Sequence, residues 1–561
     1  MTDVNRLSKE TSNAYASKVA MSAIESFEFQ ATSLIEYRSS GRVAVIGSIE
    51  AQEFASRLSG NLHAQLILTD GAVEPGVPTI PVGNRGLKIE GYLGNFTIYL
   101  GEEGSANFET VCVDLIVDLC AEPLLSMPLK PPGYLISKLE EPYLTEIEEQ
   151  LKDLTGTFEK PKYFDYDASI CAHGRSGIAG CTKCIDACPA EAITSLINSI
   201  EVNPNLCQGG GVCTSVCPTG AIRYVYPNVT DTLSIVNTLL SRYYEAGGDN
   251  PVIAFVAEAE TALLETKPDR LLVVVVEELA SIGMEVWLNA LASGAKSVLL
   301  INAGSMPVSV GEFLQSQINT ANTILSGLAY KENLIRIVDP QSLALHCEVE
   351  ESIHLIDETF EAGEFSALLE KRLFENRMDK PLQNRLDKTG EKRRTTLLAT
   401  DFLFQHSSTP QQIIALPEQS PFGRIMVDAQ SCTLCMSCTS VCPTQAISAG
   451  DDVPKLDFRE IKCVQCGICE SACPEGAISL EPRFIADAKQ RRGCVTLHEE
   501  QPFCCVTCGK AFATQSMIDN MTQKLAGHYM FKSERAKLRL MMCEECRVID
   551  VVQDNQAMDS V

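Results

Sequence analysis

Two stretches, "CTLCMSCTSVCPTQAI" at residues 432–447 and "CVQCGICESACPEGAI" at residues 463–478, decide how their part of the chain folds. Both space their cysteines as C-x2-C-x2-C-x3-C and place a proline directly after the last one. Three closely spaced thiolates hold three iron corners of a cubane, while the fourth cysteine points the other way and ligates a second cluster. The repeated spacing therefore predicts two 4Fe–4S clusters.

The crossing of the fourth cysteine predicts which residues share a cluster. The sets are Cys432, Cys435, Cys438 and Cys473 for one cluster, and Cys463, Cys466, Cys469 and Cys442 for the other. The alternative, a group of buried or zinc-bound cysteines, does not account for the double spacing. The segment resembles the two-cluster ferredoxins of bacteria, and this resemblance implies a ferredoxin module over residues 425–482.

An altered copy of the pattern lies upstream, in "CAHGRSGIAGCTKCIDACPAEAI" at residues 171–193 and "LCQGGGVCTSVCPTGAI" at residues 206–222. In the first segment, the spacing between Cys171 and Cys181 is longer than in the ferredoxin pattern. In the second, Gly210 replaces the second cysteine. We predict a further ferredoxin module over residues 166–228. The crossing rule gives Cys171, Cys181, Cys184 and Cys217 as a 4Fe–4S set, and Cys207, Cys213 and Cys188 as the incomplete set.

The incomplete set leaves the cluster type open, because Gly210 offers no side-chain ligand. Three thiolates satisfy a 3Fe–4S cluster, which is our first expectation. They can also hold a 4Fe–4S cluster whose fourth iron takes water or an outside ligand, or the site is vestigial and empty. In the stretched loop one alternative is that Cys171 is not a ligand at all. Another is that His173 is a ligand, although we expect it to be a surface histidine.

A third block, "CCVTCGKAF" at residues 504–512 and "MMCEECRVI" at residues 541–549, carries two C-x2-C hooks. Such a pair of hooks, about 35 residues apart, predicts a tetrahedral site with four thiolate ligands. Structural zinc is the expected metal, and a rubredoxin-like single iron is the alternative. Cys504, which precedes Cys505, is not expected to be a ligand. The predicted ligands are Cys505, Cys508, Cys543 and Cys546.

Composition narrows the class of protein. The chain has 561 residues, 24 cysteines and a net charge of −27. An acidic surface repels nucleic acids and anionic membranes, so neither is an expected partner. The N-terminal residues lack a secretory signal and no run of about 20 apolar residues occurs, so we expect a cytoplasmic protein without a membrane span. Clustered cysteines in a reducing compartment indicate metal or redox chemistry.

The remaining sequence predicts a multidomain α/β and α+β fold. Alternating strand and helix patterns indicate flavodoxin-like α/β domains at 41–125 and 229–345. Within the first, "VCVDLIVDLC" at 111–120 is expected to be one strand that holds Cys112 and Cys120 in the core. The other predicted parts are an N-terminal helix at 1–40, a linker with a helix at 126–165, a helical linker at 346–424, and a small metal-binding helical hairpin with four cysteine ligands and a tail at 483–561.

A basic stretch in the helical linker, "DKTGEKRRTTLL" at residues 387–398, has two interpretations. We expect it to be a solvated face. The alternative is a docking contact for an acidic partner.

The order of these parts resembles cytosolic bacterial 4Fe–4S ferredoxin-type proteins whose genes accompany formate dehydrogenase and other molybdoenzymes. The middle domain, around "ELASIGMEVWLNALASGAKSVLLI" at residues 278–301, is similar to the delta-subunit domain of methyl-viologen-reducing hydrogenases, without its cysteines. The resemblance implies an electron carrier that serves a redox enzyme such as formate dehydrogenase and has no substrate site of its own. A molybdoenzyme assembly protein and a flavin-binding oxidoreductase subunit are the alternatives.

Overall fold

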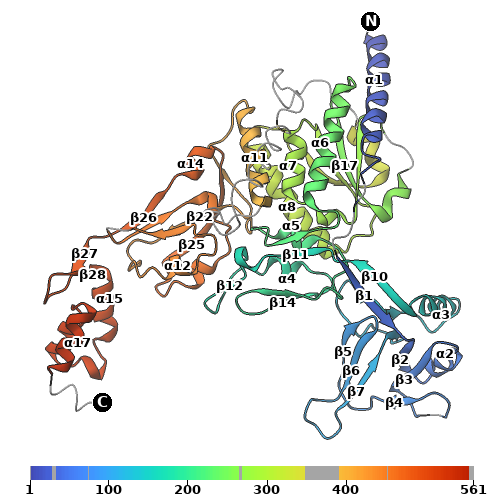
Figure 1. The fold of residues 1–561 in the computed structure, drawn as a ribbon, viewed down its shortest axis with the longest axis horizontal. Coiled ribbons are helices and arrows are strands. Elements are labelled where there is room, and N and C mark those ends of the chain that lie inside the picture. Colours follow the sequence, from blue (N-terminus) through green and yellow to red (C-terminus); the bar gives the residue numbers. More distant parts are fainter. Residues whose placement is uncertain are drawn as a thin grey trace.

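The computed structural model describes residues 2–27, 29, 33–73, 75–264, 268–347, 365, 391–450 and 453–554. Most of the predicted helical linker and the end of the predicted tail therefore lie outside the described residues. Figure 1 shows an N-terminal α/β domain, a central α/β domain, and the C-terminal segment at the far end of the molecule. Among the described residues, no helix combines the length and apolarity needed to span a membrane.

The N-terminal domain is built on a parallel sheet of five strands in the order β4-β3-β2-β8-β9. Counted along the chain this order is 3-2-1-4-5, as in Rossmann sheets, rather than the flavodoxin-like order that we predicted. The strands are β2 (Arg42–Ser48), β3 (His63–Asp70), β4 (Thr79–Pro81), β8 (Leu115–Asp118) and β9 (Tyr134–Ile136). The central strands β2, β3 and β8 have buried side chains on both faces, as apolar parallel strands require, whereas β4 and β9 at the edges are only partly buried.

Two different layers cover this sheet. Helices α2 (Ala51–Arg57) and α3 (Tyr143–Asp153) pack on one face. The other face packs against an antiparallel sheet of β5 (Leu87–Tyr92), β6 (Asn95–Leu100) and β7 (Glu109–Val113).

The expected single strand at residues 111–120 is wrong, because the chain changes sheets at Asp114. The Asp114 carboxylate is buried and accepts hydrogen bonds from the backbone N–H groups of Ser40 and Arg42, at 2.9 and 3.0 Å. These bonds hold the chain at the point where β7 ends and β8 begins. As a consequence Cys112 is exposed on β7 rather than buried, and Cys120 is half-buried after β8.

The N-terminal segment is only partly the helix that we expected. Helix α1 (Thr2–Ser22) packs on α6 (Val229–Glu245) of the central domain, where the Asn13 side chain donates to Asp249 at 2.8 Å. Strand β1 (Leu34–Ser39) then pairs antiparallel with β10 (Gly156–Pro161). Residues 126–165 are accordingly more than a linker, since they supply both β9 and β10.

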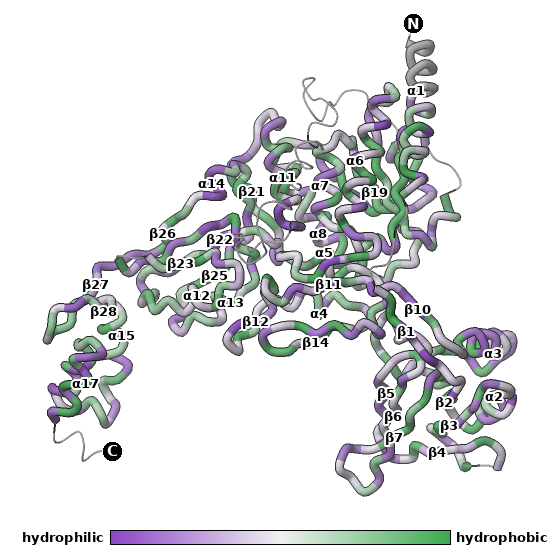
Figure 2. Tube along the Cα trace, in the orientation of Figure 1, coloured by the Kyte–Doolittle hydropathy of each residue, from purple (hydrophilic) through white to green (hydrophobic). Residues whose placement is uncertain are grey.

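The central domain has the predicted parallel sheet, in the order β18-β17-β19-β20. Counted along the chain this order is 2-1-3-4, which matches the start of a flavodoxin-like sheet. Helices cover one face around the fully buried Trp287, and hydrophobic residues concentrate in this region in Figure 2. The elements are β17 (Val252–Ala257), β18 (Leu271–Val276), β19 (Ser297–Ile301), β20 (Ile335–Val338), α7 (Met284–Ala292), α8 (Val308–Gly327) and α11 (Glu391–Gln405).

Candidate cluster and metal sites

The second cysteine block lies beside the antiparallel pair β22 (Gly423–Val427) and β25 (Ile478–Ile485). Its short helices, α12 (Ser437–Val441) and α13 (Ile468–Ser471), each carry the third cysteine of a stretch. The structure brings the eight cysteines into two groups, each around its own cavity. One cavity is lined by Cys432, Cys435, Cys438 and Cys473, and the other by Cys442, Cys463, Cys466 and Cys469. Four thiols converging on one apolar cavity fit a cubane.

The loops between the ligands wrap around each cavity by entering the left-handed region twice. Leu434 and Met436 have φ of 53° and 62° in the first stretch. Gln465 and Gly467 have φ of 54° and 79° in the second. Because each pair flanks the second cysteine of its stretch, this alternation turns three nearby thiols toward one point.

Backbone donors reach three of the four cysteines that precede a proline in the two modules. The N–H of Ala446 lies 3.3 Å from the Cys442 sulfur, and that of Ala477 lies 3.3 Å from the Cys473 sulfur. In the first block Ala192 donates to Cys188 at 3.4 Å. Hydrogen bonds to ligand sulfurs are one of the means by which a protein sets cluster potential.

The first block forms a similar module around α4 (Lys183–Ala187) and α5 (Val212–Val216). Its stretched loop is a small hairpin, β12 (Gly174–Arg175) and β13 (Ile178–Ala179). Burial raises the pKa of the Cys184 thiol, and the thiols of Cys217, Cys181 and Cys171 add to this. These four are the predicted complete set.

The three thiols of the incomplete set also lie together. Burial raises the pKa of Cys213 well above its ordinary value, and the nearby thiols of Cys207 and Cys188 add to this. All three thiols are at least half-buried beside the complete set.

Gly210 takes the place of the second cysteine in the backbone conformation of the loop as well as in the sequence. Its neighbours Gly209 and Gly211 have φ of 81° and 72°, the same left-handed alternation as in the second block. A Cβ built at Gly210 meets no heavy atom of the described residues within 4 Å. The space that a side chain at residue 210 would enter is therefore open among the described residues.

The two flanking glycines are fixed by packing. A Cβ at Gly211 would lie 2.4 Å from the Cα of Ser281, in the central domain, and one at Gly209 would lie 2.9 Å from the Tyr163 ring. The glycine loop is thus pressed against the segment that follows β18. This contact places the incomplete site beside the carboxyl edge of the central sheet.

Lys160 of β10 reaches the same loop and was not anticipated from the sequence. Its ammonium donates to the carbonyl oxygens of Asn205 and Cys207, at 3.1 and 2.5 Å. Burial lowers its pKa to about 8. Because residues 126–165 were expected to be a linker, no local signal placed this lysine near a cluster site.

Glu260 fills the crevice where the strand order of the central sheet reverses, the usual ligand site of open α/β sheets. Its buried carboxylate accepts from the N–H groups of Ala303 and Ser305, at 3.0 and 3.3 Å. An anionic cofactor would have to displace this carboxylate. The contact therefore disfavours the flavin-binding alternative.

His173 is a buried structural residue, and the expectation of a surface histidine is wrong. Its ring nitrogens lie 2.9 Å from the Cys181 carbonyl oxygen and 2.7 Å from the Ser195 hydroxyl oxygen. Only 3% of the residue is exposed. These two bonds fix the stretched loop and engage both nitrogens.

The basic stretch is also not a solvated face, over the part that the structure describes. Residues 387–390 lie outside the described residues, but the rest begins α11. Lys392 donates to the Thr214 carbonyl of the first module at 2.7 Å. Arg393 is buried and donates to the Cys463 carbonyl of the second module at 2.6 Å. Two consecutive cations thus hold both modules.

Replacing Arg393 with glutamine is expected to destabilise the second module by roughly 2–4 kcal/mol, because buried carbonyl groups lose charged donors. The carbonyls are those of Cys463, Ile461 and Pro421. Thermal bleaching of the cluster absorbance would measure the change. The same substitution at the partly exposed neighbour Arg394 is the control, and equal shifts for both variants would contradict the assignment.

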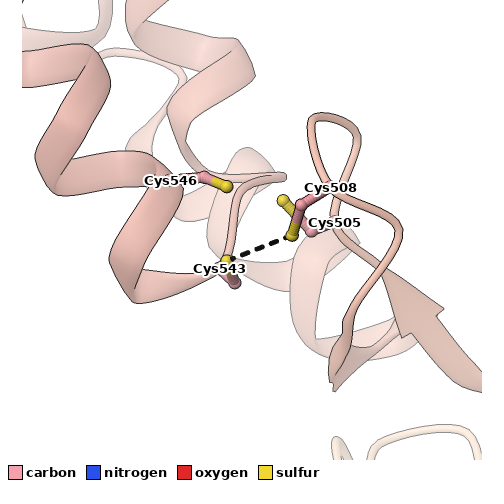
Figure 3. Close-up of side chains that lie close together, drawn as sticks. All are labelled: Cys505, Cys508, Cys543 and Cys546. Carbon is pink, nitrogen blue, oxygen red and sulfur yellow. Dashed lines mark hydrogen bonds between the residues drawn. The ribbon is translucent and has the colours of Figure 1, made fainter.

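The C-terminal hooks converge on one point, as Figure 3 shows. One hook follows β27 (Pro502–Cys504), and the other begins α17 (Glu544–Val552). The sulfurs of Cys505, Cys508, Cys543 and Cys546 all lie within 4.8 Å of one another. The exposed Cys504 is outside this group.

The Cys505 thiol is prepared to act as a thiolate. Desolvation opposes its ionisation, but backbone N–H groups of Cys543, Cys508 and Thr507 outweigh it and lower the pKa to about 6. A metal binds the deprotonated thiol, so this environment suits a metal ligand. The four-sulfur group therefore could bind a metal, in accordance with the tetrahedral site that the hooks predict.

Two segments of the chain match known family models. Residues 424–478 match the family model of the 4Fe-4S dicluster domain. Residues 200–223 match that of the 4Fe-4S binding domain. The chain carries ferredoxin-type 4Fe–4S domains. No curated protein matches it. The predicted iron–sulfur, ferredoxin-like character is thus confirmed, and these domains support an iron–sulfur electron-transfer role.

Proposed function

We propose that the protein is a cytoplasmic electron carrier with four clusters, three 4Fe–4S and one 3Fe–4S, and a structural zinc ion. The observation that carries the proposal is the grouping of the second block into two crossed sets around separate cavities. When bound, the clusters would supply one-electron transfer. The chain's cysteine thiolates would hold the clusters, and backbone N–H groups already point at the ligand sulfurs of Cys188, Cys442 and Cys473.

The 3Fe–4S assignment belongs to the set of Cys188, Cys207 and Cys213. Three thiolates converge there, and the open space at Gly210 supplies no fourth ligand from the described residues. Zinc is proposed for the C-terminal site because four closely spaced thiolates with no additional ligand in the group are typical of structural zinc.

A redox enzyme is the proposed partner. The resemblance to ferredoxin-type proteins of molybdoenzyme gene clusters points to formate dehydrogenase, and the delta-subunit-like middle domain is consistent with a redox assembly. The acidic chain, with a net charge of −27, would favour a basic docking face on that enzyme. Co-purification with formate dehydrogenase activity would support this assignment. Reduction of the protein by another redox enzyme, but not by formate dehydrogenase, would contradict it.

Paired substitutions test the crossed ligation. Cys442→Ala and Cys466→Ala alter the same predicted set, so the double variant keeps two thiolates there and should lose about four irons. Cys442→Ala with Cys435→Ala leaves three thiolates at each of two sites. It should lose only about two irons and gain 3Fe–4S signals in EPR spectra.

The reverse ranking of the two double variants would show that each stretch binds its own cluster with all four cysteines. Sulfide content follows the same logic, because a 3Fe–4S cluster keeps its four sulfides. It should fall by about four in the first double variant and stay constant in the second.

A further inference from the structure

The two ferredoxin modules touch through one ligand-bearing loop of each. Gly180 directly precedes Cys181, and Ile468 lies between Cys466 and Cys469. A Cβ built at Gly180 would lie 2.1 Å from the Cγ1 atom of Ile468, which is fully buried. The predicted ligands of two different modules are therefore one or two residues from a direct contact.

Further contacts hold this junction. Helix α11 contributes Lys392 to the first module and Arg393 to the second, as described above. Lys183, beside Cys184, donates to the carbonyl oxygen of Gln419, which precedes β22. A small cavity between the modules is lined by Cys217 together with these three cations. The junction is thus built from residues next to predicted ligands on both sides.

The other two predicted sites have contacts outside the junction, although Lys392 at the junction also reaches the carbonyl of Thr214, which follows Cys213. The Gly210 loop packs on Ser281 and Tyr163. In the Cys432 set, Cys435 is exposed, and the carbonyl of Thr433, next to Cys432, accepts a hydrogen bond from the Thr514 hydroxyl of the C-terminal segment, at 3.1 Å.

We propose that the four predicted cluster sites form one series across both modules. Its inner neighbours are the complete set of the first module and the Cys463 set of the second. Its ends are the Gly210 site and the Cys432 set. The inference rests on the proposed function, because it presumes that the sites bind clusters. Each internal step moves one electron, so one site is oxidised as its neighbour is reduced, and no bond or proton changes place.

Magnetic coupling between reduced clusters tests the order. An inner-pair variant keeps only the two inner sites, and an outer-pair variant keeps only the two ends. EPR spectra of both, after dithionite reduction, should show split and fast-relaxing signals in the inner pair and no mutual coupling in the outer pair. The substitutions are Cys207→Ala, Cys213→Ala, Cys432→Ala and Cys435→Ala for the inner pair, and Cys181→Ala, Cys184→Ala, Cys466→Ala and Cys469→Ala for the outer pair.

Uncoupled signals in the inner pair would overturn the series. Because each pair variant removes four cysteines, a second test uses a single substitution that keeps all of them. Gly180→Leu forces a side chain against Ile468, and the added Cβ would also lie 2.9 Å from the Ala172 carbonyl oxygen of its own loop. Protein that keeps its full iron content is therefore selected, and in it the coupling between the modules should be weaker. The control is Gly86→Leu, where an added Cβ meets no described heavy atom within 4 Å.

Equal coupling in Gly180→Leu and Gly86→Leu would likewise contradict the junction. Iron content separates this failure from failure of the proposed function. Protein that retains its iron but lacks coupling between modules contradicts only the series. Protein that binds no iron contradicts the electron carrier itself.

Discussion

Replacing Gly210 with cysteine is expected to raise the iron content from about 15 to about 16 per chain and to abolish the 3Fe–4S signal of the oxidised protein. The reason is geometric. The backbone at Gly210 already follows the path of the four-cysteine loops, and the space beside its Cα is open. A thiolate placed there completes the set of Cys188, Cys207 and Cys213.

Gly210→Ala is the matched control, because a methyl group fits the same space but offers no ligand. It should leave both iron content and EPR spectrum as in the unaltered chain. If the cysteine variant behaves like the alanine variant, the three thiols and residue 210 do not share one cluster. Cysteine at position 211 would be uninformative, since its Cβ would lie 2.4 Å from Ser281.

Replacing Cys543 with serine is expected to remove the zinc ion, from about one per chain to none, and to unfold the C-terminal segment from about residue 502 onward. The segment has few buried apolar side chains, among them Ile518 and Leu540, while Val548 and Val552 are exposed. So small a core cannot hold the hairpin without the metal. Limited proteolysis and metal analysis measure both effects.

Cys504→Ser is the control for the zinc site, because this exposed neighbour lies outside the four-sulfur group. It should keep the zinc and resist proteolysis. Iron content should be unchanged in both variants. Loss of iron from the Cys543 variant would show instead that the C-terminal site holds iron or supports the second module.

The cysteine spacings could be interpreted from sequence because ligation is local and stereotyped. Each C-x2-C-x2-C-x3-C-P stretch fixes its own loop, and the crossing of the fourth cysteine is built into that geometry. The parallel sheet of the central domain was also predictable, since its strands are continuous apolar runs. Gly210 was recognisable as a missing ligand from position alone.

The features that could not be predicted from the sequence depend on contacts between distant segments. Asp114 interrupts an apolar run because it binds the backbone of Ser40 and Arg42, more than seventy residues away. Arg393 lies in a stretch that looks solvated, yet its partners come from the second module. The packing of α1 on the central domain has the same origin. No local pattern encodes such pairings.

Anaerobic counting of iron, sulfide and zinc, combined with EPR before and after dithionite, tests the central claim most directly. We predict about 15 irons and one zinc per chain, and a signal of the oxidised protein that disappears on reduction. About 12 irons without that signal would contradict a cluster beside Gly210. About eight irons or fewer would contradict the account that both ferredoxin modules carry clusters.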